Sequence, residues 1–247
     1  MNRRRFLAGA GATLSLGFVG QQALRSPEST VVRVWFSDAA ASYEGLAATV
    51  EGYLGAALEP AIGPVEFDFA PEPLSLPAES GRRVLATHWP ARVARGAVGM
   101  DEVDPVDGVN LLVTDGHPTK QPSGYARPHV AAATGAESIA RMSPVDETPV
   151  VVPYSVRAAA TQVVLHEVAH ALGADHEHGA VRRTDDALVA SPMIGSYLWA
   201  SEAVRERHLP DRNACGGAVP DETDSLERRL RMRYADCALE RLGDGSR

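Results

Sequence analysis

Several residue types are scarce in this chain of 247 residues, and each shortage excludes something. Only Lys120 is lysine among the 24 basic residues, and 32 acidic residues leave a formal net charge of −8. That balance argues against nucleic acid as a partner, because phosphate binding needs a basic surface. Internal repeats and low-complexity tracts are absent too, so we expect one globular domain.

Cysteine is the scarcest residue after lysine, with only Cys215 and Cys237 present. In an oxidising compartment these two residues could form one disulfide. Two free thiols are the alternative, and the sequence alone leaves both open.

The first residues match an export signal. The run Asn2-Arg3-Arg4-Arg5-Phe6-Leu7 fits the twin-arginine pattern, in which paired arginines precede two apolar residues. The weakly apolar run at residues 8–19 is shorter than the about 20 residues of a membrane-spanning helix. We therefore expect a signal peptide over residues 1–24, the twin-arginine export machinery as a partner, and a secreted protein. An uncleaved leader would instead anchor the protein to a membrane.

One segment carries most of the chemical information. Residues 166–176 read HEVAHALGADH, the pattern H-E-x-x-H-x-x-G-x-x-H. The absence of proline and glycine between Ser155 and Gly173 predicts a helix over residues 155–172. Positions four apart on a helix differ in direction by about 40°, so His166 and His170 project from one face.

The remaining residues of this motif complete a metal site. Glu167 lies one step round the same turn, where it reaches a water on a metal without being a ligand. Gly173 offers the positive φ that ends the helix, so the chain turns back and delivers His176 as a third ligand. Three protein ligands with a fourth position open are typical of a catalytic Zn²⁺ site, because structural zinc sites close all four. The alternative is a set of surface histidines on an amphipathic helix.

This extended motif resembles that of the metzincins, a clan of zinc metallopeptidases with a second signature, a downstream methionine turn. Residues 191–197 read SPMIGSY, and Met193 matches that turn by its position and its flanking proline and glycine. The resemblance implies a methionine beneath the metal, where an ordinary buried methionine is the alternative. It also makes Tyr197 a candidate ligand or oxyanion-stabilising hydroxyl, although such metzincins place the tyrosine two residues after the methionine and not four.

The rest of the chain predicts an α+β fold. We expect helices at residues 43–58 and 79–98, the second split or ended by Pro90. An acidic cluster at residues 221–224 predicts a further helix to about residue 242. Strands are expected at residues 31–36, 65–69, 109–113 and 129–133.

This order of elements ahead of the metal helix resembles the metzincin upper lobe. It implies a zincin-like, two-lobe domain with a twisted mixed sheet, an active-site helix, a Met-turn and a C-terminal helix. A single catalytic domain would span residues 31–242, with an upper lobe at about 31–173 and a lower lobe at about 174–242. In metzincins a late edge strand pairs with extended substrates, and here that strand is expected at residues 130–134.

The other histidines are interpreted as surface or packed residues, with His178 as a candidate competing ligand or supporting group. They are His88, His117, His129, His178 and His208.

These predictions together describe an exported zinc endopeptidase in which Glu167 acts as the general base and a protein or peptide is the substrate. Two alternatives stay open. One is a zinc amidohydrolase acting on a non-peptide amide, and the other is a secreted binding protein that has lost turnover on the same scaffold. The intact Glu167 argues against the second.

Overall fold

The computed structural model describes residues 29–81, 83–116, 121–209, 215 and 226–245. The leader predicted at residues 1–24 lies outside this part of the chain, as does His117. Among the residues that are described, no helix is both long enough and apolar enough to cross a membrane.

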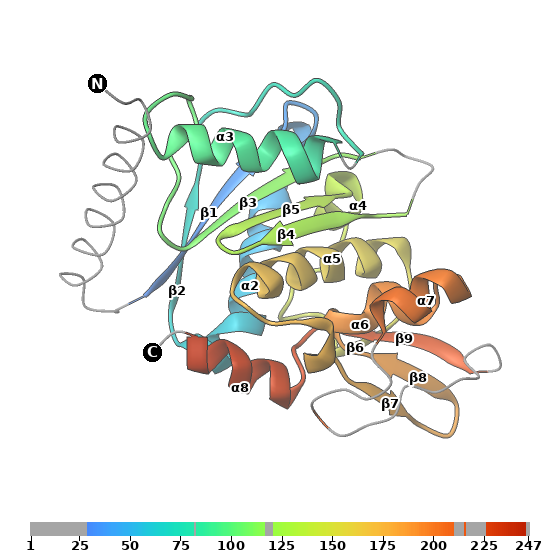
Figure 1. The fold of residues 1–247 in the computed structure, drawn as a ribbon. Helices are drawn as coiled ribbons and strands as arrows, with labels where there is room; N and C mark the ends of the chain where they lie inside the picture. Colours follow the sequence, from blue (N-terminus) through green and yellow to red (C-terminus); the bar gives the residue numbers. More distant parts are fainter. Residues whose placement is uncertain (1–28, 82, 117–120, 210–214, 216–225, 246–247) are drawn as a thin grey trace.

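Two mixed sheets form the frame of the molecule (Figure 1). The strands are β1 (Thr30–Phe36), β2 (Val65–Phe69), β3 (Val109–Thr114), β4 (Gly124–Arg127), β5 (Val130–Thr134), β6 (Val151–Pro153), β7 (Val181–Arg183), β8 (Ala187–Ala190) and β9 (Glu227–Arg231). The five-stranded sheet has the order β2-β1-β3-β5-β4, with β4 antiparallel at one edge and the other strands parallel. The four-stranded sheet has the order β6-β9-β8-β7, in which β8 and β9 run parallel and the other pairs antiparallel.

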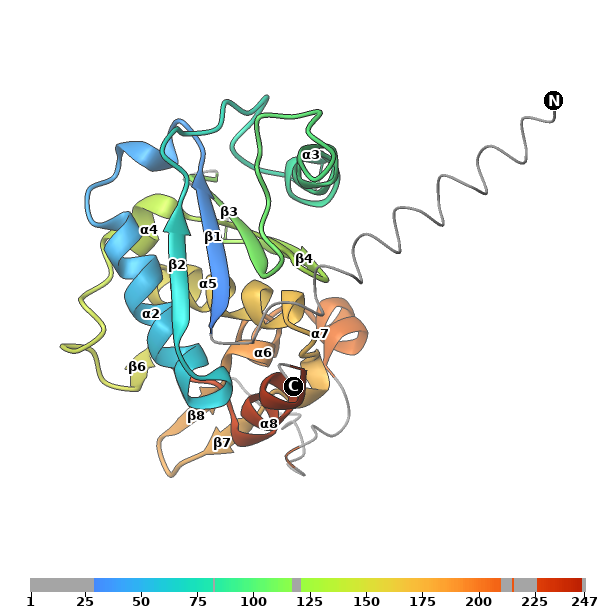
Figure 2. The ribbon, with the colours of Figure 1, turned by 90° about the vertical axis from the view of Figure 1, so that its left-hand side faces the viewer.

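Helices cover both faces of the larger sheet, with α2 and α5 on one face and α3 on the other (Figures 1 and 2). The α-helices are α2 (Leu46–Ile62), α3 (Trp89–Gly96), α4 (Ala136–Ala140), α5 (Val156–Ala171), α6 (Pro192–Leu198), α7 (Glu202–His208) and α8 (Asp236–Gly245). Short turns of other helix types are η1 (Ala40–Ser42), η2 (Val84–His88) and η3 (His176–His178).

The larger sheet is buried on both faces, and β3 is buried at every position. Because successive side chains of a strand point to opposite faces, Leu111 packs in the core shared with α2 and α5, whereas Leu112 packs in the core shared with α3. A parallel strand covered on both faces carries a continuous apolar run. On the α3 side, the indole nitrogen of Trp89 donates to the carbonyl of Ala131 at 2.9 Å, so helix and sheet are also joined by a buried hydrogen bond.

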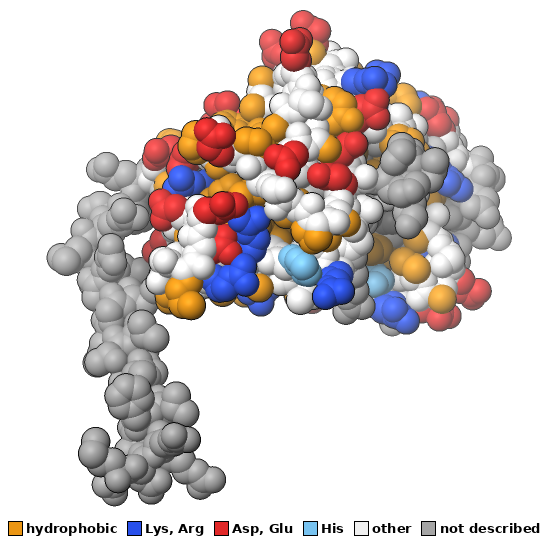
Figure 3. Space-filling view, turned by 90° about the horizontal axis from the view of Figure 1, so that it is seen from above, with side chains coloured by type: hydrophobic (Ala, Val, Ile, Leu, Met, Phe, Trp, Pro, Cys, Tyr) orange, Lys and Arg blue, Asp and Glu red, His pale blue; other side chains and the backbone are white. Residues whose placement is uncertain are grey.

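Charged side chains of both signs are interspersed over the face above α3 (Figure 3). Some of them pair: the carboxylate of Asp101 accepts from Arg92 Nε at 3.1 Å and from Arg95 Nη2 at 2.6 Å. The Asp101 side chain is only 8% exposed, so these bonds fix the loop that follows α3.

The mixed α+β class and most of the predicted elements are confirmed. The strands predicted at 31–36, 65–69 and 109–113 coincide with β1, β2 and β3, and the predicted strand at 129–133 is β5. The helix predicted at 43–58 is α2, which begins at Leu46 and continues past Pro60. Within the helix predicted at 79–98, the structure has the π-turn η2 over Val84–His88, followed by α3. That wider turn lies directly before Pro90, whose ring would clash with the carbonyls of a regular helix.

Two predictions are wrong. The strand at residues 130–134 is not an edge strand, because β5 lies between β3 and β4 and the edge is β4. The helix predicted from 221 to 242 is a strand followed by a short helix: β9 pairs with β6 and β8, and α8 begins only at Asp236. Residues 221–224, the predicted cap, lie outside the described part. The division into lobes stays a prediction, although β6, which precedes α5, shares a sheet with β9.

Helix α5 begins at a serine cap. Ser155 Oγ accepts a hydrogen bond from the backbone N–H of Ala158 at 3.1 Å, which satisfies a donor that the first helical turn leaves open.

We expect Ser155→Ala to lower the free energy of unfolding by about 1 kcal/mol, measured by urea denaturation. Ser155→Asn keeps a capping oxygen and should stay close to the wild type. An unfolding midpoint unchanged by Ser155→Ala would contradict this role.

Candidate metal centre

Helix α5 carries His166, Glu167 and His170, and it lies in the interior of the molecule. Its bounds, Val156–Ala171, confirm the helix predicted from the run without proline or glycine. Most of its residues are buried, because the helix packs against β4 and β5 of the larger sheet and against α2, α4 and α6. His166 is 1% exposed and Glu167 is 6% exposed. The motif therefore does not lie on a solvent-facing surface of an amphipathic helix.

The chain reverses at Gly173, as predicted. Gly173 has a φ of 95°, a conformation that favours glycine. Its N–H donates to the carbonyl of His170 at 3.0 Å, and the N–H of Ala174 donates to that of Ala169 at 2.9 Å. These two bonds form a Schellman motif, which closes the helix end and directs the chain back towards α5.

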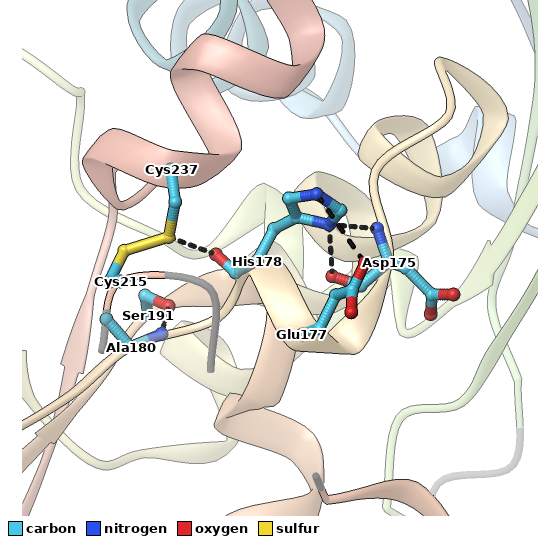
Figure 4. Close-up of a disulfide and its surroundings, with 7 residues drawn as sticks. All are labelled: Asp175, Glu177, His178, Ala180, Ser191, Cys215 and Cys237. Atoms are coloured by element: carbon cyan, nitrogen blue, oxygen red, sulfur yellow. Dashed lines mark hydrogen bonds and ion pairs between the residues drawn. A yellow bond between two sulfur atoms is a disulfide. The ribbon is translucent and has the colours of Figure 1, made fainter. Parts of the chain in front are cut away.

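The returning chain forms η3, which carries His176. Asp175 caps this turn, because its Oδ1 accepts from the N–H of His176 at 2.7 Å. In return, the Nδ1 of His178 accepts from the N–H of Asp175 at 3.0 Å (Figure 4). The His178 ring is thus part of the cap, and it does not belong to the histidine cluster described next.

The three motif histidines converge. One nitrogen from each of the rings of His166, His170 and His176 lies within 4.8 Å of the others. The Nε2 atoms of His166 and His170 are 3.1 Å apart. Tetrahedral zinc with bonds of 2.0–2.1 Å would hold two nitrogens about 3.3 Å apart. His176 Nε2 is buried without a hydrogen-bond partner among the described residues, so a metal ion would satisfy it. The three-imidazole donor set suits zinc, and the spacing of His166 and His170 is close to the zinc value.

Backbone carbonyls orient two of these rings. His166 Nδ1 lies 2.9 Å from the carbonyl oxygen of Pro192, and His170 Nδ1 lies 2.8 Å from that of Ala174. A carbonyl can only accept, so each Nδ1 carries the proton and each Nε2 keeps its lone pair. Both lone pairs are therefore available on the side where the rings converge.

Burial keeps the imidazoles neutral. It lowers the pKa of His166 well below the ordinary value of 6.5, and the neighbouring His170 and His176 lower that pKa further. Burial also lowers the pKa of His170. Burial and the proximity of His170 lower the pKa of His176 to about 4. Since only a neutral imidazole binds a metal, all three rings can act as ligands at neutral pH.

Glu167, the neighbour of His166 in the motif, lies against the edge strand β4. Burial raises the pKa of its carboxyl to about 8. Gly124, the first residue of β4, leaves the space that this carboxyl occupies: a Cβ at position 124 would lie 2.5 Å from Glu167 Oε1 and 2.7 Å from Cδ. The position of Glu167 thus depends on the absence of a side chain at residue 124.

Helix α6 brings Tyr197 to the cluster. Its hydroxyl lies 3.5 Å from His166 Nε2, and its ring centroid lies 4.7 Å from that of His176. Burial and the charge of Glu167 raise the pKa of Tyr197 to about 12, so the hydroxyl keeps its proton.

Met193 is fully buried in the core beside α5, but residues 192–198 form a short helix. Whether Met193 lies beneath a metal stays a prediction.

His208 lies beside the site, although the sequence predicts it only as a surface or packed residue. It ends α7, and its ring stacks on that of Tyr197 with the centroids 4.6 Å apart and the planes at 11°. Its centroid is 5.6 Å from that of His176. His208 lies 32 residues beyond His176 in the chain, and no pattern of residues connects the two. Only the packing of α6 and α7 brings them together.

Cys215 and Cys237 form a disulfide, the first of the two alternatives left open above (Figure 4). The Sγ of Cys237, at the start of α8, lies 3.5 Å from the carbonyl oxygen of His178. A second link joins the same segment to α6: the N–H of Ala180 donates to Ser191 Oγ at 2.8 Å. The segment after His176 is thus held from two sides.

The lowered pKa values predict how zinc binding depends on pH. If the three histidines had the ordinary pKa of 6.5, protonation would weaken apparent zinc affinity several hundred-fold between pH 7 and pH 5.5. With pKa values lowered by burial, the ligands stay neutral and the affinity should change by less than about threefold. Competition with a chelator of known pH dependence measures this affinity. A several hundred-fold loss would show that the imidazoles titrate as exposed groups do.

No family model and no curated protein match the chain. Among solved structures it is similar to the crystal structure of archaemetzincin from Methanopyrus kandleri, with a TM-score of 0.44 and 14% sequence identity, over 90% of this chain and 98% of that chain.

Proposed function

We propose that this chain is an exported, metzincin-like zinc endopeptidase with a zincin-like fold. The observation that carries the proposal is the convergence of three neutral imidazole nitrogens beside a buried carboxyl at the edge of a sheet. His166, His170 and His176 would hold the ion, and the fourth position would stay open.

Each group around the ion would have a separate role in the reaction. Bound zinc supplies a Lewis acid that polarises a peptide carbonyl and lowers the pKa of a water. Glu167 takes up the proton of that water and passes it to the leaving amine nitrogen. Burial strengthens the affinity of this carboxyl for a proton, and a cation bound beside it would lower its pKa again, so that the carboxyl is ionised when it accepts the proton. The Tyr197 hydroxyl, which keeps its proton, donates a hydrogen bond to the developing oxyanion.

The edge strand β4 is the place for an extended substrate. It pairs with β5 on one side and ends the sheet on the other, so its outer backbone groups can bind a peptide by strand addition. Gly124 sets that edge directly beside Glu167. A peptide bound along β4 would thus pass the reacting carboxyl, which favours peptides over small amides.

Purification of the mature chain allows the direct test. We expect about one zinc per chain and hydrolysis of a general protein substrate that a chelator abolishes and added zinc restores. Cleavage of non-peptide amides alone would favour the amidohydrolase alternative. Zinc binding without any hydrolysis would favour the binding protein. Cell fractionation tests export, with a variant that carries lysine at all three of Arg3, Arg4 and Arg5 as control.

Glu167→Gln separates metal binding from turnover. The amide keeps the shape of the side chain but cannot take up a proton, so hydrolysis should fall by about 10²- to 10⁴-fold while zinc content stays unchanged. The measurement is kcat/KM on a quenched peptide together with metal analysis. Activity close to that of the wild type would refute the assigned role of Glu167.

Gly124→Ala tests the contact between β4 and Glu167. The new methyl group would overlap the carboxyl and displace it, so kcat/KM should fall by about 10²-fold with zinc still bound. Gly55→Ala is the matched control, because a Cβ there would lie 3.6 Å from Phe67, an ordinary contact. Equal activity of the two variants would show that Glu167 tolerates a side chain at residue 124.

A further inference from the structure

Among the described residues, three other rings contact the ring of Tyr197. The His208 ring is stacked on it, with the planes at 11° and the centroids 4.6 Å apart. The rings of His166 and His176 meet it at steep angles of 67° and 60°, with centroids 5.4 Å and 4.7 Å away. His166 and His176 are proposed metal ligands, so of these three contacts the stack on His208 is the one that the metal site does not explain.

Hydrogen bonding does little to fix the position of Tyr197. Within the described part of the chain, its hydroxyl has one hydrogen-bond neighbour, His166 Nε2, and the 3.5 Å between the two atoms is at the limit of a hydrogen bond. In the proposed function the lone pair of that nitrogen binds the ion, so it cannot also accept from the hydroxyl. The contacts of the ring would then decide where the hydroxyl lies.

A stacked neighbour restrains that position. The hydroxyl of a tyrosine lies on the axis of its ring, so rotation about χ2 leaves it in place and any displacement requires the whole ring to move. The His208 ring blocks movement towards the face that it covers, and sliding of the two rings past each other loses stacked area. The stack therefore opposes displacement of the hydroxyl from His166.

The backbone holds His208 in place as a support. Only residues 199–201 separate α6 from α7, and the N–H of Ala200 closes this turn by donating to the carbonyl of Tyr197 at 3.0 Å. Burial lowers the pKa of His176, and a hydrogen bond with the backbone of His208 opposes this effect. The end of α7 is thus tied to the site through its main chain, and the side chain of His208 is left to contact Tyr197.

We infer that His208 is a positioning residue of the proposed peptidase, whose ring holds Tyr197 by stacking and so keeps the hydroxyl within reach of the oxyanion. The nitrogens of His208 do not belong to the cluster of converging ligand atoms, so a role as a metal ligand is not what the geometry favours. Any flat ring of similar size should serve. This inference rests on the proposed function, because it concerns the same reaction.

His208→Ala removes the ring and keeps the backbone that bonds His176. We expect kcat on a quenched peptide to fall by about tenfold, because the hydroxyl would spend less time at the oxyanion. KM and zinc content should stay within about twofold of the wild-type values, since the ligands and the substrate contacts do not change.

Further variants test whether the flat ring is what matters. His208→Phe keeps a ring without nitrogens, so kcat should stay within about twofold of the wild type. His208 borders a cavity of about 260 Å³, which leaves room for the larger ring. Glu206→Ala, at an exposed position of the same helix outside that cavity, is the matched control and should leave kcat unchanged. If thermal melts show His208→Ala unfolded, His208→Leu replaces it with the same expectation, because leucine fills space without a flat face.

A double-mutant cycle shows whether His208 acts through Tyr197. Tyr197→Phe removes the hydroxyl, and kcat should fall by about 10²-fold. Adding His208→Ala to Tyr197→Phe should lower kcat by no more than about twofold further, because no hydroxyl is left to position. Two residues that act independently would instead give losses that multiply.

Inhibitor binding gives a readout without turnover. A phosphinic peptide carries a tetrahedral anionic group in place of the cleaved bond and resembles the transition state. The zinc-loaded His208→Ala and Tyr197→Phe variants should each bind it about tenfold more weakly than the wild type, measured by calorimetry, and the double variant no more weakly than Tyr197→Phe. His208→Phe should bind it as the wild type does.

The inference is overturned if His208→Ala keeps the wild-type kcat, if His208→Phe loses as much as His208→Ala, or if the two losses multiply in the double variant. Full activity of Tyr197→Phe also overturns it and leaves zinc-dependent hydrolysis standing. Absence of zinc-dependent cleavage by the wild type contradicts the proposed function instead, and the role of His208 falls with it.

Discussion

The candidate metal centre depends on the turn at Gly173, because α5 alone supplies only two of the three imidazoles. The Schellman bonds of Gly173 and Ala174 reverse the chain and bring His176 back to the helix. The carbonyl of Ala174 also accepts from His170 Nδ1, so the turn that delivers one ring orients another. Helix α8 supports the turn from outside, since Arg241 Nε donates to the carbonyl of Gly173 at 3.0 Å.

Burial of this turn and of α5 has two opposite electrostatic consequences. An apolar environment disfavours the charged form of any group, so it lowers the pKa of the imidazoles and raises that of Glu167. The first effect leaves nitrogen lone pairs available for a cation, and the second strengthens the affinity of the Glu167 carboxyl for a proton. One physical cause thus prepares both the ligands and the acid–base group, and the packing of α5 between the two sheets supplies it.

The parts of the site that lie within one short segment could be predicted from the sequence. The spacing of His166, His170, Gly173 and His176 predicted the helix, its end and the converging rings, since each depends on neighbours in the chain. Contacts between distant segments could not be predicted in this way. Strand β4 is only four residues long and begins with glycine, so it has no strand pattern of its own. Strand β9 reads ERRLR, and only its pairing with β6 and β8 makes it a strand. His208 reaches Tyr197 through the packing of α6 and α7, which no local pattern indicates.

Under the proposed function, three imidazoles would bind a single ion and leave one position open. X-ray absorption at the zinc edge of the purified, zinc-loaded chain measures this most directly. We expect three imidazole nitrogens at about 2.0–2.1 Å and one further light-atom ligand that an inhibitor with a zinc-binding group replaces. A sulfur ligand, four imidazoles, or a shell that such an inhibitor leaves unchanged would contradict it.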